Sequence, residues 1–164
     1  MTSCNVRMYT QQTLPDKSRR LIKTQLAHTC QGKVDSAWGK QQVDKVDRVI
    51  VATKIVDSTR SGAQRVTICG FCLATIKKRY MYVDLLCSAM RYGSICLKRA
   101  ETEARKLRLS HIKLSALPQV ISFYRRKGYA HVTDPCSEKP KKKKMGSKIF
   151  GYSMSKCLEL KNNL

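Results

Sequence analysis

Apolar residues recur along the first half of the chain with periods that predict one helix followed by three strands. Residues 16–31 predict the helix, with Asp16 placed to cap it. Its apolar face is made of Leu21, Ile22, Leu26 and Cys30. A run of β-branched residues at 48–56 is typical of a strand. Residues 66–76 are apolar on both faces, which favours a central strand covered on each side, and residues 80–88 predict another strand.

The second half of the chain predicts a helix, a strand, a helix and two further strands. Residues 95–109 carry apolar side chains at helical spacing, and residues 111–116 alternate as a strand does. Residues 119–127 predict a second helix, with Gly128 as its C-terminal stop. The closing strands are expected at 129–132 and 149–158. This order predicts a mixed α/β fold with a central sheet.

A length of 164 residues suits one domain. Its expected parts are a helical N-terminal part at 1–47, a core at 48–132, a lysine-rich loop at 133–148, and a final strand and tail at 149–164. Apolar residues make up 42%, which is enough for a core. No apolar run approaches the roughly 20 residues that a membrane span needs, which excludes an integral membrane protein.

The N-terminal ten residues are polar and lack the apolar segment of a secretory signal. We therefore expect an intracellular protein, cytoplasmic or nuclear. The eight cysteines are then expected to be reduced.

The formal net charge of +22 favours a polyanionic partner such as nucleic acid over a merely soluble surface. The densest cluster is Lys139 with residues 141–144. This lysine block is also compatible with a nuclear import signal. Charge alone names no reaction.

The connection from the strand at 80–88 to the following helix is short and contains Gly93. A strand that enters a tight turn and then a helix aims free backbone N–H groups and the positive end of the helix dipole at one point, where phosphate binds readily. Arg91 and Lys98 add positive charge. An ordinary strand-to-helix turn is the alternative interpretation.

The segments YVDLLCS (82–88), MRYGSI (90–95), HIKLSA (111–116) and FYRRKGY (123–129) follow one another in a specific order. The chain resembles the GCN5-related N-acetyltransferases in the order of these segments and in the FYRRKGY motif. The resemblance covers residues 45–132, and the final hairpin fits the family's last two strands. It implies a central mixed sheet flanked by helices, with a V-shaped opening between two central strands.

The resemblance implies that the core binds acetyl-coenzyme A. The backbone of residues 85–87 would pair with the pantetheine arm, one of its N–H groups would polarise the thioester carbonyl, and residues 90–94 would hold the pyrophosphate. The implied cofactor-binding residues are Leu85, Leu86, Cys87, Ser88, Met90, Arg91, Tyr92, Gly93, Ser94 and Ile95.

Two side chains are candidates for proton transfer. Tyr124 matches the family's general acid for the departing sulfur, and an unperturbed tyrosine, with a pKa of about 10, is protonated at neutral pH. The alternative is an aromatic ring that packs the helix onto the sheet. Asp84 is an acid in an otherwise apolar strand, and it is either the base that deprotonates the amine or the partner of a neighbouring cation.

The cysteines offer two weaker hypotheses. Cys69 and Cys72 have the spacing of a metal or redox pair, but residues three apart in a strand face opposite sides, so we expect structural cysteines and no metal. Cys87 is a possible nucleophile for a covalent route, although no histidine lies near it in sequence.

The predicted function is transfer of an acetyl group from acetyl-coenzyme A directly to an amine of a protein or peptide, with the basic surface docking the enzyme on nucleic acid or nucleoprotein. The acceptor groove is sought in an acidic cluster formed by Asp35, Asp44, Asp47 and Asp57. One alternative is a non-catalytic nucleic-acid-binding protein on the same scaffold, favoured by Met90 and Ile95 in the turn. A polyamine or small-molecule acetyltransferase is the other.

Overall fold

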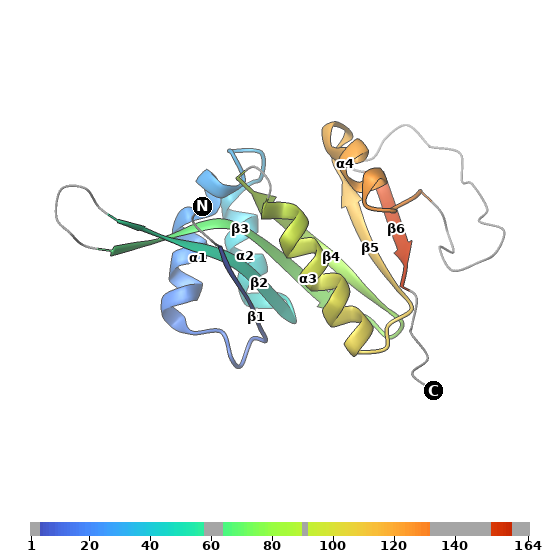
Figure 1. Ribbon diagram of the computed structural model, residues 1–164, viewed down its shortest axis with the longest axis horizontal. Coiled ribbons are helices and arrows are strands. Elements are labelled where there is room, and N and C mark those ends of the chain that lie inside the picture. The colour runs from blue at the N-terminus through green and yellow to red at the C-terminus, as the bar shows by residue number, and fades with distance from the viewer. Residues whose placement is uncertain (1–3, 58–63, 90–91, 132–151, 159–164) are drawn as a thin grey trace. The chain divides into compact units, whose positions relative to one another are not determined.

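The computed structural model describes residues 4–57, 64–89, 92–131 and 152–158. In chain order its elements are β1 (Asn5–Tyr9), α1 (Asp16–Thr29), α2 (Ser36–Lys45), β2 (Arg48–Asp57), β3 (Gln64–Ile76), β4 (Tyr80–Ser88), α3 (Tyr92–Lys106), β5 (His111–Ala116), the 3₁₀ turn η1 (Pro118–Val120), α4 (Ile121–Arg126) and β6 (Tyr152–Cys157), as Figure 1 shows.

The described strands lie in one six-stranded sheet in the order β1-β2-β3-β4-β5-β6. β4 and β5 pair in parallel, whereas β1 with β2, β2 with β3, and β5 with β6 pair antiparallel. The sheet is therefore mixed and flanked by helices, which confirms the predicted fold class. None of the described helices is long and apolar enough to cross a membrane.

The chain divides into two compact units, and we describe each by itself. The first unit contains Met1–Thr75 and Asp84–Ala100, and the second contains Ile76–Val83 and Glu101–Leu164. β4 and α3 are each divided, with one part in the first unit and the other part in the second. That the chain is a single domain stays a prediction.

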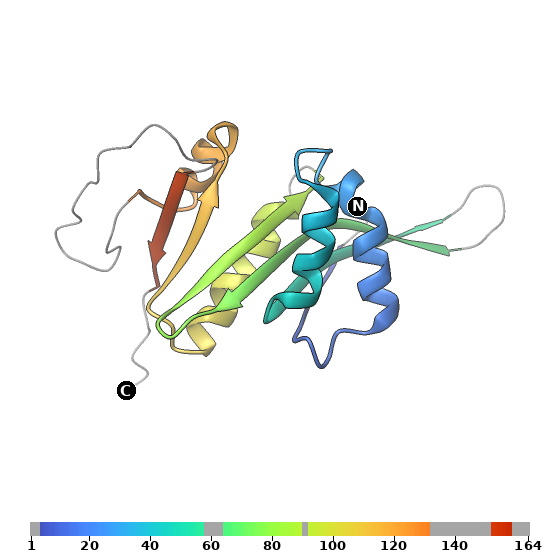
Figure 2. The same cartoon turned by 180° about the vertical axis from the view of Figure 1, so that it is seen from behind.

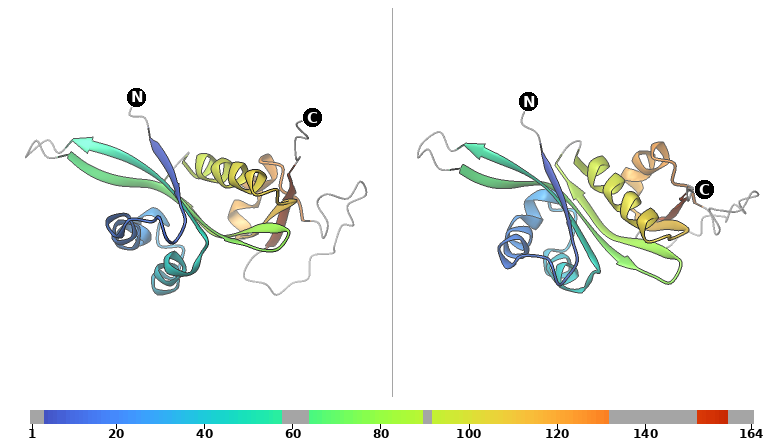
Figure 3. Two further views of the ribbon diagram at one scale, coloured as in Figure 1. Left: turned by 90° about the horizontal axis from the view of Figure 1, so that it is seen from below. Right: turned by 60° about the horizontal axis from the view of Figure 1, so that its bottom comes forward.

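In the first unit, α1 and α2 lie on one face of strands β1–β3 (Figures 2 and 3). Their apolar side chains form one core with that face of the strands. Its members include Leu14, Ile22, Leu26, Val43, Val49, Val51, Ile68, Phe71 and Leu73. Gly39 of α2 permits a close approach to α1, because a Cβ there would lie 2.9 Å from Cδ2 of Leu26. The core therefore fixes both helices against the sheet.

The sequence predicts a helical N-terminal part, and this prediction is wrong in one respect, because the part also contains a strand. β1 pairs with β2 from Asn5 opposite Thr53 to Tyr9 opposite Val49. α2 lies in the part expected to be helical, but no separate helix was predicted there; Val43 and Gly39 are its buried residues, too few for a clear helical period. Asp16 is the first residue of α1, and no side-chain hydrogen bond caps that helix.

In the second unit, β4 residues Tyr80–Val83 pair with His111–Leu114 of β5, and β5 pairs along its length with β6. The buried side chains include Met81, Ile112, Leu114, Tyr129 and Met154. The predicted stop after α4 is confirmed, because Gly128 has a φ of +86°. The strand expected at 129–132 reduces to one bridge between Ala130 and Ser155. The lysine-rich loop lies outside the described residues, and the V-shaped opening between two central strands stays a prediction.

Candidate active site

The C-terminal half of β4 places alternate side chains in different surroundings. Leu85 and Cys87 are buried in the core that α1 and α2 cover. Asp84, Leu86 and Ser88 are half-buried, and they share the opposite face because side chains alternate along a strand. The segment expected to contact the pantetheine arm is therefore anchored through every second side chain.

Asp84 has a hydroxyl partner. Thr75 Oγ1 donates a hydrogen bond of 2.7 Å to Asp84 Oδ2. The pKa of the buried Cys72 thiol is raised well above its ordinary value, first by burial and then by Cys96 and Asp84. Asp84 is thus an oriented carboxylate at the edge of a sulfur-rich interior. Its expected role as a base stays a prediction.

Cys87 is bonded to Cys30. The disulfide spans a sequence separation of 57 residues, with the two Cα atoms 4.8 Å apart, and it ties the end of α1 to β4. Cys157 is also disulfide-bonded. The expectation that all cysteines are reduced is therefore wrong, and Cys87 in this form has no thiol for a covalent route. Neither residue carries a local signal of the bond, because a pairing across 57 residues depends on the tertiary fold.

The junction between β4 and α3 brings the helix start against the strand end. A Cβ on Gly93 would lie 2.7 Å from Ser88 Oγ, so the glycine permits this close approach. Ala89 N donates to Cys69 O at 2.9 Å, which fixes the strand end to β3. The packing of the helix start against the strand end is therefore enough to explain a glycine at this position, without a bound ligand.

α3 begins at Tyr92, earlier than the expected 95, so Gly93, Ser94 and Ile95 lie in its first turn. Ile95 is 44% exposed. The first N–H groups of a helix have no intrahelical acceptor, and no acidic residue stands in this turn. These residues fit a pyrophosphate. The other two expected ligands, Met90 and Arg91, lie outside the described residues.

Tyr124 lies in α4, buried with 7% of its surface exposed. Phe123 meets its ring edge-on with centroids 5.0 Å apart, and Tyr129 does so at 5.8 Å. Main-chain N–H groups of Lys127 and Tyr129 donate to the Tyr124 carbonyl. Tyr124 therefore lies in the helix that the sequence predicts and packs against two other rings, and its role as a general acid stays a prediction.

Glu101 joins two other side chains of the second unit, and this role was not predicted from the sequence. The carboxylate, in a residue that is 7% exposed, accepts a hydrogen bond from Tyr129 Oη at 3.1 Å and pairs with Lys156 Nζ at 3.0 Å. It thereby holds the aromatic ring that contacts Tyr124. The available signal was its position four residues after the buried Leu97, on the apolar face of the helix.

Cys96 and Cys69, two thiols of the first unit, are poor nucleophiles. Burial raises the pKa of Cys96 to about 12. Burial and a hydrogen bond with Cys4, whose Sγ lies 3.2 Å away, raise the pKa of Cys69 to about 11. Neutral thiols react slowly. Among the described residues, no group of three His, Cys, Asp or Glu is placed to hold a metal ion.

Two of the four acids expected to line an acceptor groove have structural partners. Asp35 caps α2 by accepting a hydrogen bond from Trp38 N at 2.7 Å. Asp44 pairs with Arg19 at 2.9 Å and with Lys23 at 2.6 Å. These two acids therefore have structural roles in the first unit, and the acidic-groove hypothesis stays a prediction.

The sequence matches no protein-family model and no curated protein. The structure is similar to solved acetyltransferases. It superposes on an acetyltransferase from Streptococcus agalactiae with a TM-score of 0.64 and 12% identity, over 96% of this chain and 100% of the other. For GCN5 from Tetrahymena the TM-score is 0.60 and the identity 12%, over 96% and 97%.

The PaiA N-acetyltransferase from Thermoplasma acidophilum, solved in complex with coenzyme A, gives a TM-score of 0.54 and 15% identity, over 94% of this chain and 99% of the other. Each similarity spans nearly the whole of both chains, so it concerns the complete arrangement of strands and helices. The chain therefore has the fold of the GCN5-related N-acetyltransferases.

Proposed function

We propose that the protein is an N-acetyltransferase that moves an acetyl group from acetyl-coenzyme A directly to an amine. The observation that carries the proposal is the junction of β4 and α3, where an acid-free first helical turn with Gly93 follows the anchored strand end. The coenzyme, when bound, supplies the activated thioester. The solved complex of a similar fold with coenzyme A supports this choice of cofactor.

The N-terminus of α3 binds the pyrophosphate. The N–H groups of Tyr92, Gly93, Ser94 and Ile95 donate to its oxygens, and the helix dipole favours the negative charge. Met90 and Arg91 complete this turn in the proposal. Main-chain groups of residues 85–87 would align the pantetheine arm, and one of their N–H groups would donate to the carbonyl oxygen, which gains charge during transfer.

Tyr124 and Asp84 move the protons. The Tyr124 hydroxyl protonates the departing sulfur, and its buried, ring-packed setting supports a fixed donor. Asp84 accepts a proton from the amine, directly or through water, while Thr75 holds its orientation.

The acceptor that we propose is an amine of a protein or peptide. The net charge of +22 supports docking on nucleic acid or nucleoprotein, where such an acceptor is bound. A loss of nucleic-acid affinity between about 50 and 200 mM salt is expected for such docking, and salt-independent binding would contradict it. An intracellular location stays a prediction, and the Cys30–Cys87 disulfide counts against a strongly reducing compartment.

The first experiment is a thermal shift with acetyl-coenzyme A. A ligand at 100 times its dissociation constant stabilises a fold by about 2.7 kcal/mol. If acetyl-coenzyme A does not stabilise the protein, the non-catalytic nucleic-acid-binding alternative is favoured. Met90 and Ile95 in the turn support that alternative. A panel of protein, polyamine and small-molecule amines, analysed by mass spectrometry, then distinguishes the enzyme alternatives.

The second experiment compares Tyr124→Phe with Tyr129→Phe. Loss of a general acid lowers turnover by about 10²–10⁴-fold. We expect that loss in Tyr124→Phe, with the thermal shift by acetyl-coenzyme A retained. Tyr129→Phe removes a hydroxyl from the same ring cluster, one that donates to Glu101, and should keep turnover. Full activity of Tyr124→Phe would remove the acid role.

A further inference from the structure

The first unit contains a cavity of about 720 Å³ that no step of the proposed transfer uses. It lies between β1, the first half of α1 and the strands β2 and β3, and none of its lining residues belongs to β4 or α3. Its apolar wall is formed by Leu21, Ile22, Val51, Ile55, Val66 and Ile68.

The cavity exists because the apolar face of β2 and β3 extends further than the helix α1 that covers it. Val51 and Ile68 belong to the core beneath α1. Further along the same face, Ile55 pairs with Val66 beyond the point where β1 begins, at Asn5 opposite Thr53. Ile55 is 55% exposed and Val66 is 39% exposed. Figure 1 shows β2 and β3 continuing past β1. An apolar surface is thus left open beside the helix.

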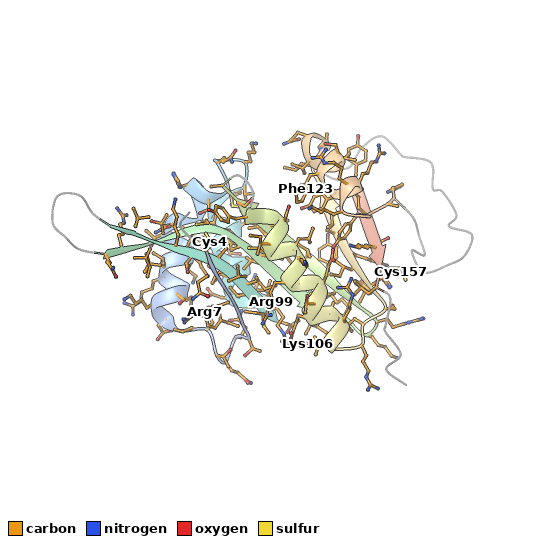
Figure 4. The ribbon with its side chains drawn as sticks, in the orientation of Figure 1. Cys4, Arg7, Arg99, Lys106, Phe123 and Cys157 are labelled. Atoms are coloured by element: carbon orange, nitrogen blue, oxygen red, sulfur yellow. A yellow bond between two sulfur atoms is a disulfide. The ribbon has the colours of Figure 1, made fainter. Side chains whose placement is uncertain are left out.

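Two cations line the cavity, one from a strand and one from a helix. Arg7 projects from β1, where Figure 4 labels it, and shares its face with Val51 because the two are paired in register. Lys17 comes from the first turn of α1. Among the described residues neither has an acidic partner, whereas Arg19 and Lys23 of the same helix pair with Asp44. No acid is found among the described lining residues. Within the part of the chain that the structure describes, no acid therefore compensates the charge of the cavity.

We propose that this cavity binds an amphiphilic anion of the fatty-carboxylate class. The carboxylate lies between Arg7 and Lys17, and the alkyl chain covers the apolar wall that ends at Ile55 and Val66. The volume falls in the range of about 300–1,000 Å³ that small-molecule sites occupy. A protein partner would need roughly 800 Å² of contact surface on each side, so a site of this size favours a small molecule. The binding does not depend on acetyl transfer.

The test is calorimetric titration of the full chain with decanoate below its micellar concentration. We expect saturable binding that weakens when hexanoate replaces decanoate, because less apolar surface is buried. Decyltrimethylammonium, which carries the same chain on a cation, should not bind. Failure of decanoate to bind, or equal binding of the cationic probe, overturns the proposal.

Charge-matched variants locate the site. Arg7→Gln with Lys17→Gln removes both cavity cations and should weaken decanoate binding at least tenfold. Lys33→Gln with Lys40→Gln removes two exposed charges outside the cavity lining and should leave the affinity unchanged. Equal losses in the two double variants would show general attraction to a basic protein and overturn the site. Ile55→Ser tests the apolar wall separately, and it should reduce the preference for decanoate over hexanoate.

Discussion

Removal of the Cys30–Cys87 disulfide should be among the most destabilising changes in the first unit. The bond closes a loop with a sequence separation of 57 residues. In the chain-entropy model such a loop lowers the entropy of the unfolded chain by about 14 cal/mol/K, which corresponds to about 4 kcal/mol at 25 °C. We therefore expect Cys30→Ala with Cys87→Ala to lose about 4 kcal/mol of unfolding free energy.

The control for this variant is Cys96→Ala. Cys96 is a buried free thiol, so its substitution removes a sulfur from the interior without opening a loop. It should cost about 1 kcal/mol, typical of a small core truncation. Urea unfolding followed by circular dichroism measures both free energies.

A reductant provides the second comparison. It also acts on the disulfide of Cys157, so its effect on the double alanine variant reports that bond alone. We expect the wild type to lose more stability on reduction than the variant does. The reasoning is refuted if both lose the same amount, or if the variant is no less stable than Cys96→Ala.

Three further changes test single contacts. Glu101→Leu leaves Lys156 without its carboxylate and should cost about 3 kcal/mol in urea unfolding; adding Lys156→Met should restore much of it, and no recovery would contradict the pairing. Gly93→Ala should cost about 1 kcal/mol by its contact with Ser88 Oγ despite the better helix propensity of alanine, and Ser88→Ala in the same chain should relieve the loss. Asp44→Asn should cost at most about 1 kcal/mol at pH 7. The hydrogen bond from Lys23 lowers the pKa of Asp44 from 3.8. The difference in stability between the Asn variant and the wild type should therefore persist above about pH 4 and vanish as the pH falls further. Thermal melting at a series of pH values measures this difference, and a difference that does not change with pH would refute the reasoning.

The sequence predicted best the elements whose periodicity is uninterrupted. β4 and β5 begin and end where the alternation of apolar residues begins and ends, at Tyr80–Ser88 and His111–Ala116. Gly128 marked the end of α4 because a left-handed residue is needed there. In each case the signal is local, and no distant contact is required to produce it.

The missed features depend on partners elsewhere in the chain. β1 exists because β2 offers it an edge, and α2 is stabilised by the contact of Gly39 with Leu26. The Cys30–Cys87 bond joins elements that only the tertiary fold brings together. No window of sequence reports such contacts.

The candidate site shows the same division. Tyr124 and Gly93 were chosen from local motifs, and they lie in α4 and in the first turn of α3, while their roles stay predictions. The environment that holds Tyr124 was not predicted, because it depends on Glu101, which reaches Tyr129 across a separation of 28 residues. Motifs thus located the groups, while their orientation came from packing.

The chemistry of the sulfur atoms favours direct transfer over a covalent acyl-enzyme. Such an intermediate needs a thiolate, but Cys87 is bonded to Cys30, and burial raises the pKa of Cys72 and Cys96 so that their thiols stay neutral at physiological pH. The pKa of Cys69, at about 11, has the same consequence. A covalent route through any of these four cysteines would therefore have to use a group that burial or bonding has made unreactive, whereas direct transfer requires only a neutral amine, a polarised carbonyl and a proton donor.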